Sequence, residues 1–96
     1  MATATREWHI DFDKLRSKDS MLKKVGVALE FPAHFGRNLD ALYDCLTDLP
    51  LHKGGHYAIH LDNLERSPAA DALHAVFADA REYWAEAGVT LAIIRE

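Results

Sequence analysis

Three carboxylates recur at four-residue intervals in the stretch "NLDALYDCLTDL". They are Asp40, Asp44 and Asp48, and no lysine or arginine lies between Asn38 and Leu51. On a helix, like charges at this spacing repel one another, and here no cation is interleaved to relieve the repulsion. The row fits either an ordinary solvated helix face or a surface that binds cationic side chains of a basic partner. The choice depends on which element of secondary structure carries these carboxylates and on which groups lie opposite them.

Histidines offer a second kind of chemistry. His52, His56 and His60 recur every four residues, which on a helix would align metal ligands, but Gly54 and Gly55 interrupt any helix there. We therefore expect no metal site and no cofactor.

Catalysis is a third possibility. His34 and Asp40 could form an acid and base pair, but no nucleophile motif, phosphate-binding loop or convergent ligand set accompanies them. Cys45 is expected on the flank of a helix as a small packing residue. The sequence thus favours a protein that is not an enzyme.

A helix over residues 39–48 is expected to carry the carboxylates. Asn38 is a suitable N-cap, and apolar residues follow at i, i+3, i+4 and i+7: Leu39, Leu42, Tyr43 and Leu46. On a helical wheel the carboxylates lie well away from the centre of this apolar stripe. They should point to water.

Two further helices are predicted. An amphipathic pattern runs over residues 17–30 and should stop before Pro32, since proline biases its predecessor away from the helical region. Ser67 and Pro68 form the N-cap and N1 pair of a third helix, which continues to Gly88.

Three strands are predicted between and around these helices. Residues 8–12 and 57–62 alternate apolar and polar side chains, whereas residues 89–94, "VTLAII", are nearly all apolar, as is typical of a strand covered on both faces. The order β-α-α-β-α-β predicts an α/β fold with a small three-stranded parallel sheet packed with helices.

Composition sets the class of protein. The 96 residues are 49% hydrophobic, enough for a single domain over residues 1–96. Fifteen acidic and eleven basic residues give a net charge of −4, which disfavours direct binding to nucleic acid or an anionic membrane. The lone Cys45 and the lack of a signal-like or membrane-spanning segment predict a soluble, cytoplasmic protein.

The stretch "FPAHFGRNLDALYDCLTDL", residues 31–49, resembles the helix-two signature of the barstar family, intracellular protein inhibitors of bacterial ribonucleases. Weaker similarity continues in the element order, the length and the last helix and strand. The resemblance implies a barstar-like fold and a monomer that forms a 1:1 complex with a barnase-like ribonuclease or a related nuclease toxin.

The resemblance also implies site residues. The two aspartates of the signature, which lie at the ribonuclease interface in the family, fall on Asp40 and Asp44, and Asp44 would face the cations that hold substrate phosphate. Asp79 stands where the family has a glutamate. The remaining implied contacts lie in the loop before the second helix and on that helix: Phe35, Gly36, Asn38 and Tyr43, the last in place of a tryptophan.

Three positions depart from the family pattern. His34 replaces a tyrosine, Arg37 replaces a glutamate and Leu49 replaces a tryptophan. Arg37 would repel a basic active-site rim, so the identity of the target stays open.

The expected function is that of an inhibitor, of the antitoxin or immunity type, whose acidic residues mimic RNA phosphate in a ribonuclease active site. The alternative is an immunity or masking protein for a different basic nuclease or nucleic-acid-binding partner.

Overall fold

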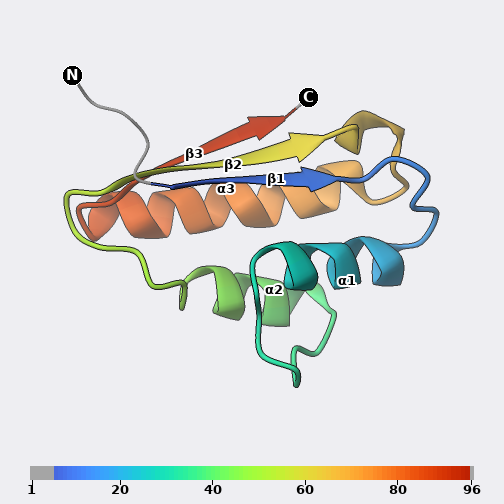
Figure 1. Cartoon of the computed structure of the whole chain (residues 1–96), viewed down its shortest axis with the longest axis horizontal. Coiled ribbons are helices and arrows are strands. Elements are labelled where there is room, and N and C mark those ends of the chain that lie inside the picture. The colour runs from blue at the N-terminus through green and yellow to red at the C-terminus, as the bar shows by residue number, and fades with distance from the viewer. Residues whose placement is uncertain (1–5, 96) are drawn as a thin grey trace.

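The structure is a computed structural model that describes residues 6–95 (Figure 1). Along the chain the elements are β1 (Arg6–Asp11), α1 (Lys18–Ala28), α2 (Leu39–Leu46), β2 (His56–Asp62), the 3-10 helix η1 (Leu64–Arg66), α3 (Ala70–Glu86) and β3 (Thr90–Arg95). The α/β class and the predicted order of strands and α-helices are confirmed.

The three strands form one parallel sheet in the order β1-β2-β3. All three α-helices lie on the same side of this sheet (Figure 1). Helix α1 packs against β1, α3 packs against β3, and α2 packs mainly on α3. Helix α2 is therefore held on the outside of the molecule by a helix, not by the sheet.

The predicted apolar stripes meet in one core. Trp8 and Ile10 of β1, and Ile59 and Leu61 of β2, are buried beneath the helices, and Phe77 of α3 is fully buried against them. Burying a large apolar side chain stabilises a fold by about 1.5–3 kcal/mol. The strand periodicity thus identified the correct inner face.

The last strand differs from expectation. Strand β3 is an edge strand of the sheet, and no helix within residues 6–95 covers its outer face, where Ala92 is exposed. On that face Ala92 pairs with Ala58 and Ile94 pairs with His60 of β2. The expectation that both faces of this strand are covered is therefore wrong, because the helices of residues 6–95 cover its inner face alone.

The start of the third helix is also corrected. The 3-10 helix η1 buries Leu64 and brings Ser67 into an extended conformation, so α3 begins at Ala70 with Ala69 as its N-cap. The Ser67 hydroxyl is buried, and it has no hydrogen-bond partner in the part of the chain that the structure describes. The burial of Leu64 overrides the local Ser-Pro signal.

The other helix limits agree with the sequence to within two residues. Helix α1 starts after Ser17, which forms a capping box with Ser20. Helix α2 ends at Leu46 with Thr47 as its C-cap, two residues before the predicted end. Gly88 follows the C-cap of α3 with φ +83°, as expected of a C′ glycine. No helix among residues 6–95 is both long enough and apolar enough to cross a membrane.

Candidate functional site

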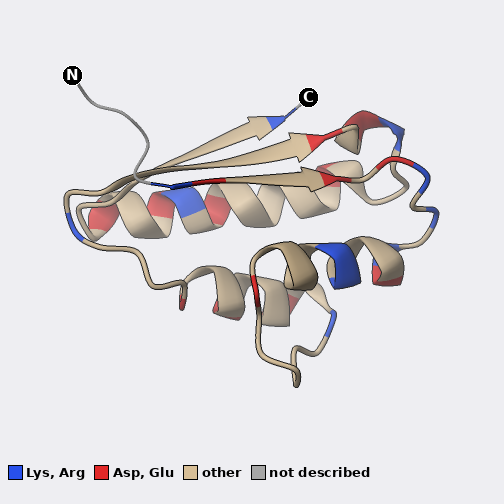
Figure 2. Cartoon of the chain, in the orientation of Figure 1, with Lys and Arg blue, Asp and Glu red and all other residues tan. Residues whose placement is uncertain are grey.

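Helix α2 presents its carboxylates to solvent. The Asn38 side chain accepts a hydrogen bond from the Ala41 amide at 2.7 Å, which fixes the start of the helix. Leu42 and Leu46 are fully buried, and the opposite face is left to the predicted aspartates. Figure 2 shows acidic but no basic residues on α2. The prediction that the three aspartates point outward is confirmed.

Trp84 fixes α2 against α3. Its side chain is buried, and its indole Nε1 donates a hydrogen bond to the carbonyl oxygen of Leu46 at 2.9 Å. Leu46 is the last residue of α2, so this bond satisfies a carbonyl that the helix cannot pair internally. Trp84 therefore packs in the core and holds together the two helices that carry the site.

Helix α3 brings Asp79 beside α2. An open hollow of about 420 Å³ is lined by both helices: Leu39, Asp40, Tyr43, Asp44, Val76 and Asp79. Three carboxylates and one aromatic ring that the resemblance implies as contacts therefore line one hollow, although Asp79 lies far along the chain from the others.

A second hollow adjoins the first, because both are lined by Tyr43 and Asp79. Its other lining residues come from the C-terminal half of α3: Glu82, Tyr83 and Glu86. Tyr83 is 44% exposed, unusually open for a large side chain of this protein. It follows Asp79 by four residues and so shares its helix face, which is the only signal in the sequence that places it here.

His34 lines a third hollow, beside the C-terminal end of α2. Asp44, Asp48 and Tyr83 also line it, and so does Cys45. No lysine or arginine lines any of the three hollows within residues 6–95. Glu30 also lines the third hollow, but it forms an ion pair with Arg6 at 3.3 Å. We refer to the other exposed carboxylates of the three hollows together as the acidic face: Asp40, Asp44, Asp48, Asp79, Glu82 and Glu86.

The carboxylates of the acidic face have no ion-pair or hydrogen-bond partner among the described residues. The single cation of α3, Arg81, lines a different hollow, which Glu82 and Val89 also line, and no ion pair joins Arg81 to Glu82. Burial raises the pKa of the Cys45 thiol, and the negative charges of Asp44 and Asp48 raise this pKa further. This thiol is therefore protonated at neutral pH and ill suited to nucleophilic chemistry.

In the loop before α2, the residues that the resemblance implies as partner contacts point in two directions. Gly36 and Asn38 stay with the helix start, where the Asn38 amide donates a hydrogen bond to the Gly36 carbonyl at 3.3 Å. Phe35 turns toward α1 and packs edge-on against Phe31, with ring centroids 5.0 Å apart. Arg37 turns the same way and pairs with a residue of α1. The structure therefore does not bring Phe35 and Arg37 to the acidic face.

Leu49, the third departure from the family pattern, is buried in the core. Leu49 reaches the third hollow only from the core, since it is 7% exposed there.

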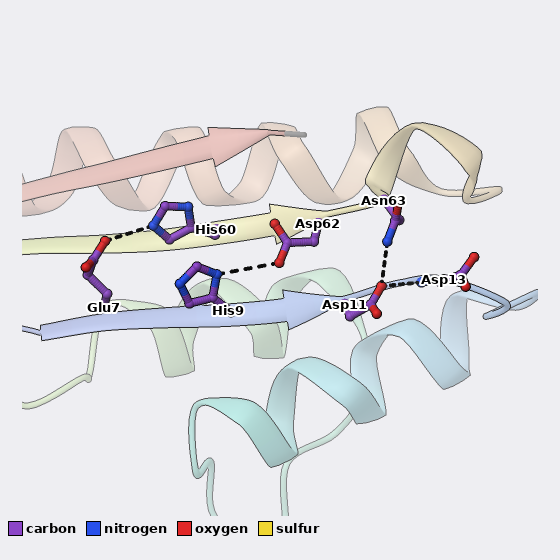
Figure 3. A network of polar contacts seen from close by, with 7 residues as sticks. All are labelled: Glu7, His9, Asp11, Asp13, His60, Asp62 and Asn63. Atoms are coloured by element: carbon purple, nitrogen blue, oxygen red, sulfur yellow. Dashed lines mark hydrogen bonds and ion pairs between the residues drawn. The ribbon is translucent and has the colours of Figure 1, made fainter.

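A separate polar cluster lies on the open face of the sheet (Figure 3). The rings of His9 and His60 stack with centroids 4.1 Å apart and an angle of 8° between their planes. Each imidazole meets a carboxylate: His60 Nε2 lies 2.9 Å from Glu7 and His9 Nδ1 lies 3.5 Å from Asp62. Across residues 6–95, no group of three or more potential ligands is arranged to hold a metal ion.

Comparison with known proteins identifies the family. The family model described as "Barstar (barnase inhibitor)" matches residues 5–96. The chain belongs to the barstar family. The signature stretch and the fold agree with this membership, and the family description gives ribonuclease inhibition as the general role.

One curated relative is also similar in sequence over part of its length. The protein named "Putative ribonuclease inhibitor YrdF" from Bacillus subtilis (strain 168) is 50% identical over 44 residues, which cover 43% of this chain and 45% of that relative. The match thus spans less than half the length of either protein.

Proposed function

We propose that this protein inhibits a bacterial ribonuclease by laying its acidic face over the cations with which the enzyme holds RNA phosphate. The observation that carries the proposal is the set of carboxylates on α2 and α3 that share neighbouring hollows and have no cationic partner among residues 6–95. Family membership and the name of the relative support a ribonuclease as the partner.

The mechanism rests on substitution of carboxylate for phosphate. A ribonuclease must hold phosphate with fixed arginine and lysine side chains, and a carboxylate forms strong charge-assisted hydrogen bonds with the same groups. Asp40, Asp44 and Asp79 supply such carboxylates without a bond that the enzyme could cleave. The protein would therefore occupy the active site without being turned over, which is the action of an inhibitor and requires no catalysis of its own.

Rigidity adds to the affinity of such a site. Helices α2 and α3 are joined by the hydrogen bond from Trp84 to Leu46, so the carboxylates of both helices keep their relative positions before binding. Preorganised groups lose less conformational entropy on association. The net negative surface would also speed the encounter with a basic enzyme through long-range attraction.

The biological setting proposed is the cytoplasm, where one inhibitor molecule acting as a single domain binds one enzyme molecule as an antitoxin or immunity protein. Contacts from His34, Gly36, Asn38 and Tyr43 would complete the interface around the acidic face. Phe35 would act indirectly, by packing the loop on α1.

The test is stoichiometric inhibition. Bacterial ribonucleases, including a barnase-like enzyme and any that co-purifies with the protein, are titrated with it while RNA cleavage is followed. We expect cleavage to stop at one equivalent, and an Asp40→Asn/Asp44→Asn variant to require a large excess. The double variant Glu7→Gln/Asp13→Asn removes two charges away from the acidic face and serves as the matched control.

Full RNA cleavage by every enzyme in the panel, at inhibitor excess, would rule the proposal out. Capture of a basic nuclease of another kind by the wild type, abolished in the Asp40→Asn/Asp44→Asn variant, would instead select the alternative of an immunity or masking protein.

A further inference from the structure

The loop before α2 carries one cation, Arg37, beside a surface that otherwise gathers carboxylates. The Nε atom of Arg37 lies 3.1 Å from Oδ1 of Asp19. Asp19 lies in the first turn of α1, and Arg37 adopts a left-handed backbone conformation with φ +46°. The ion pair therefore joins the binding loop to a different helix.

The direction of the Arg37 side chain is informative. Arg37 lines a hollow over α1 together with Lys23, Val27 and Phe35, and it lines none of the hollows that contain the acidic face. Its guanidinium is thus turned toward α1 and away from the surface proposed to meet the ribonuclease.

Asp40 is an alternative partner close at hand. It follows Arg37 by three residues, so their Cα atoms can be at most about 11 Å apart, and a long arginine side chain can cover much of that distance. Asp40 nevertheless has no partner among the residues that the structure describes, whereas Asp19 is paired. Held by Asp19, Arg37 leaves Asp40 available to a partner.

We infer that Asp19 is a positioning residue of the inhibitory surface. It holds Arg37 over α1, which keeps Asp40 unpaired and keeps an isolated positive charge away from the basic rim of the target. The inference rests on the proposed function, because its consequence appears when a basic enzyme approaches. It also explains how the chain carries an arginine at a position where the resemblance implies a glutamate.

Physical considerations set the size of the effect. Both side chains are substantially exposed, 48% for Arg37 and 67% for Asp19, so the pair contributes little to folding. A cation at the rim of an interface acts mainly on the association rate and on its dependence on salt. Loss of Asp19 should therefore affect binding more than stability.

The test is a double-mutant cycle on the complex with the inhibited ribonuclease. Asp19→Asn should slow association about threefold to tenfold at low ionic strength, and the difference should shrink as salt is added. In an Arg37→Gln background the same Asp19→Asn change should slow association no more than a distant loss of one charge. Arg37→Gln alone should leave association unchanged or faster.

Asp13→Asn provides that distant loss, because Asp13 is exposed, lies before α1 and lines none of these hollows. Urea unfolding of each variant shows that the fold is retained, which matters because Asp19 lies at the positive end of a helix.

Each outcome decides the inference. An effect of Asp19→Asn that is no greater than that of Asp13→Asn, or equal in both backgrounds, overturns it. Weaker binding by Arg37→Gln alone also overturns it, since Arg37 would then contact an acidic group of the enzyme directly. If the wild type binds no ribonuclease, the proposed function fails and the inference with it; normal wild-type binding with an uncoupled pair removes the inference only.

Discussion

Two surfaces of this molecule differ in whether their carboxylates have partners within the chain. On the open face of the sheet Glu7 and Asp62 meet histidines, and Asp11 accepts a hydrogen bond from the Asn63 amide at 2.8 Å. On the acidic face of α2 and α3 no carboxylate has a partner within residues 6–95. The open face of the sheet pairs its carboxylates internally, whereas the acidic face leaves its carboxylates available to a partner.

The difference follows from which residues lie opposite each carboxylate. Register places His9 beside His60 on adjacent strands, within reach of carboxylates on the same face. Along α2 the neighbours at three and four residues from Asp44 are apolar, small or acidic. Paired carboxylates can be removed only at some cost to the fold, but unpaired ones relieve repulsion when they are removed.

The largest expected effect is that of Asp44→Ala on the ribonuclease complex. Loss of a carboxylate buried against cations should leave those cations unpaired, costing about 3 kcal/mol or about 100-fold in Kd. Titration calorimetry or inhibition kinetics measures this. Urea unfolding should show equal or slightly greater stability; a substantially less stable variant would mean that Asp44 supports the fold, and the contrast between the two surfaces would disappear.

Asp40→Ala and Asp79→Ala should have intermediate effects. Each removes one carboxylate from the hollow shared by α2 and α3, and about tenfold in Kd, or about 1.4 kcal/mol, is expected for each. Inhibition constants at two salt concentrations measure the loss. Because Asp79 comes from the other helix, unchanged binding by Asp79→Ala would confine the interface to α2.

Glu7→Gln should reduce the stability of the fold and leave inhibition unchanged. Glu7 pairs with His60 on the far side of the sheet, so inhibition should be unchanged while the free energy of unfolding falls by up to about 1 kcal/mol. Urea unfolding followed by circular dichroism measures the second quantity. A marked loss of inhibition would show that the sheet face also takes part in binding.

Asn63→Gly should produce the smallest change, in pH dependence alone. The hydrogen bond from Asn63 lowers the pKa of the Asp11 carboxyl below its ordinary value of 3.8, helped by the Asp13 amide. A carboxyl with a lowered folded pKa stabilises the fold above its unfolded pKa, and this contribution is lost as pH falls through the folded value. Glycine keeps the left-handed backbone of Asn63, at φ +60°, without the side chain.

In that variant the pKa of Asp11, followed by NMR titration, should move up toward 3.8. The part of the stability difference that comes from the Asp11 carboxyl should be present at neutral pH and vanish in strong acid. An unchanged titration would show that the Asp13 amide alone holds the carboxylate.

Local patterns in the sequence predicted what depends on local geometry. The outward direction of Asp40 and Asp44 follows from the 3.6-residue period and the buried Leu42, and the start of α2 follows from Asn38. The open outer face of β3 could not be predicted, because cover by a layer depends on where distant helices pack. The late start of α3 depends in the same way on burial of Leu64.

The residues of the candidate site that lie on α2 could be predicted from the pattern of that helix, whereas those placed by contacts between elements could not. Asp79 was identified only through the family resemblance, since nothing in its own helix distinguishes it from a solvated face. The Arg37–Asp19 pair depends on a contact between elements separated along the chain, and no periodicity reports that contact. Tyr83 could have been placed only by its four-residue spacing from Asp79 on α3.

The bond from Trp84 to the end of α2 gives the protein a fluorescence reporter. The chain has two tryptophans, and Trp84 contacts the ring of Tyr83 edge-on, with centroids 5.3 Å apart, where Tyr83 lines a hollow of the proposed interface. An indole in this position senses both the last turn of α2 and an occupant of the hollow. With Trp8 replaced by phenylalanine, its emission would follow complex formation in real time without any attached dye.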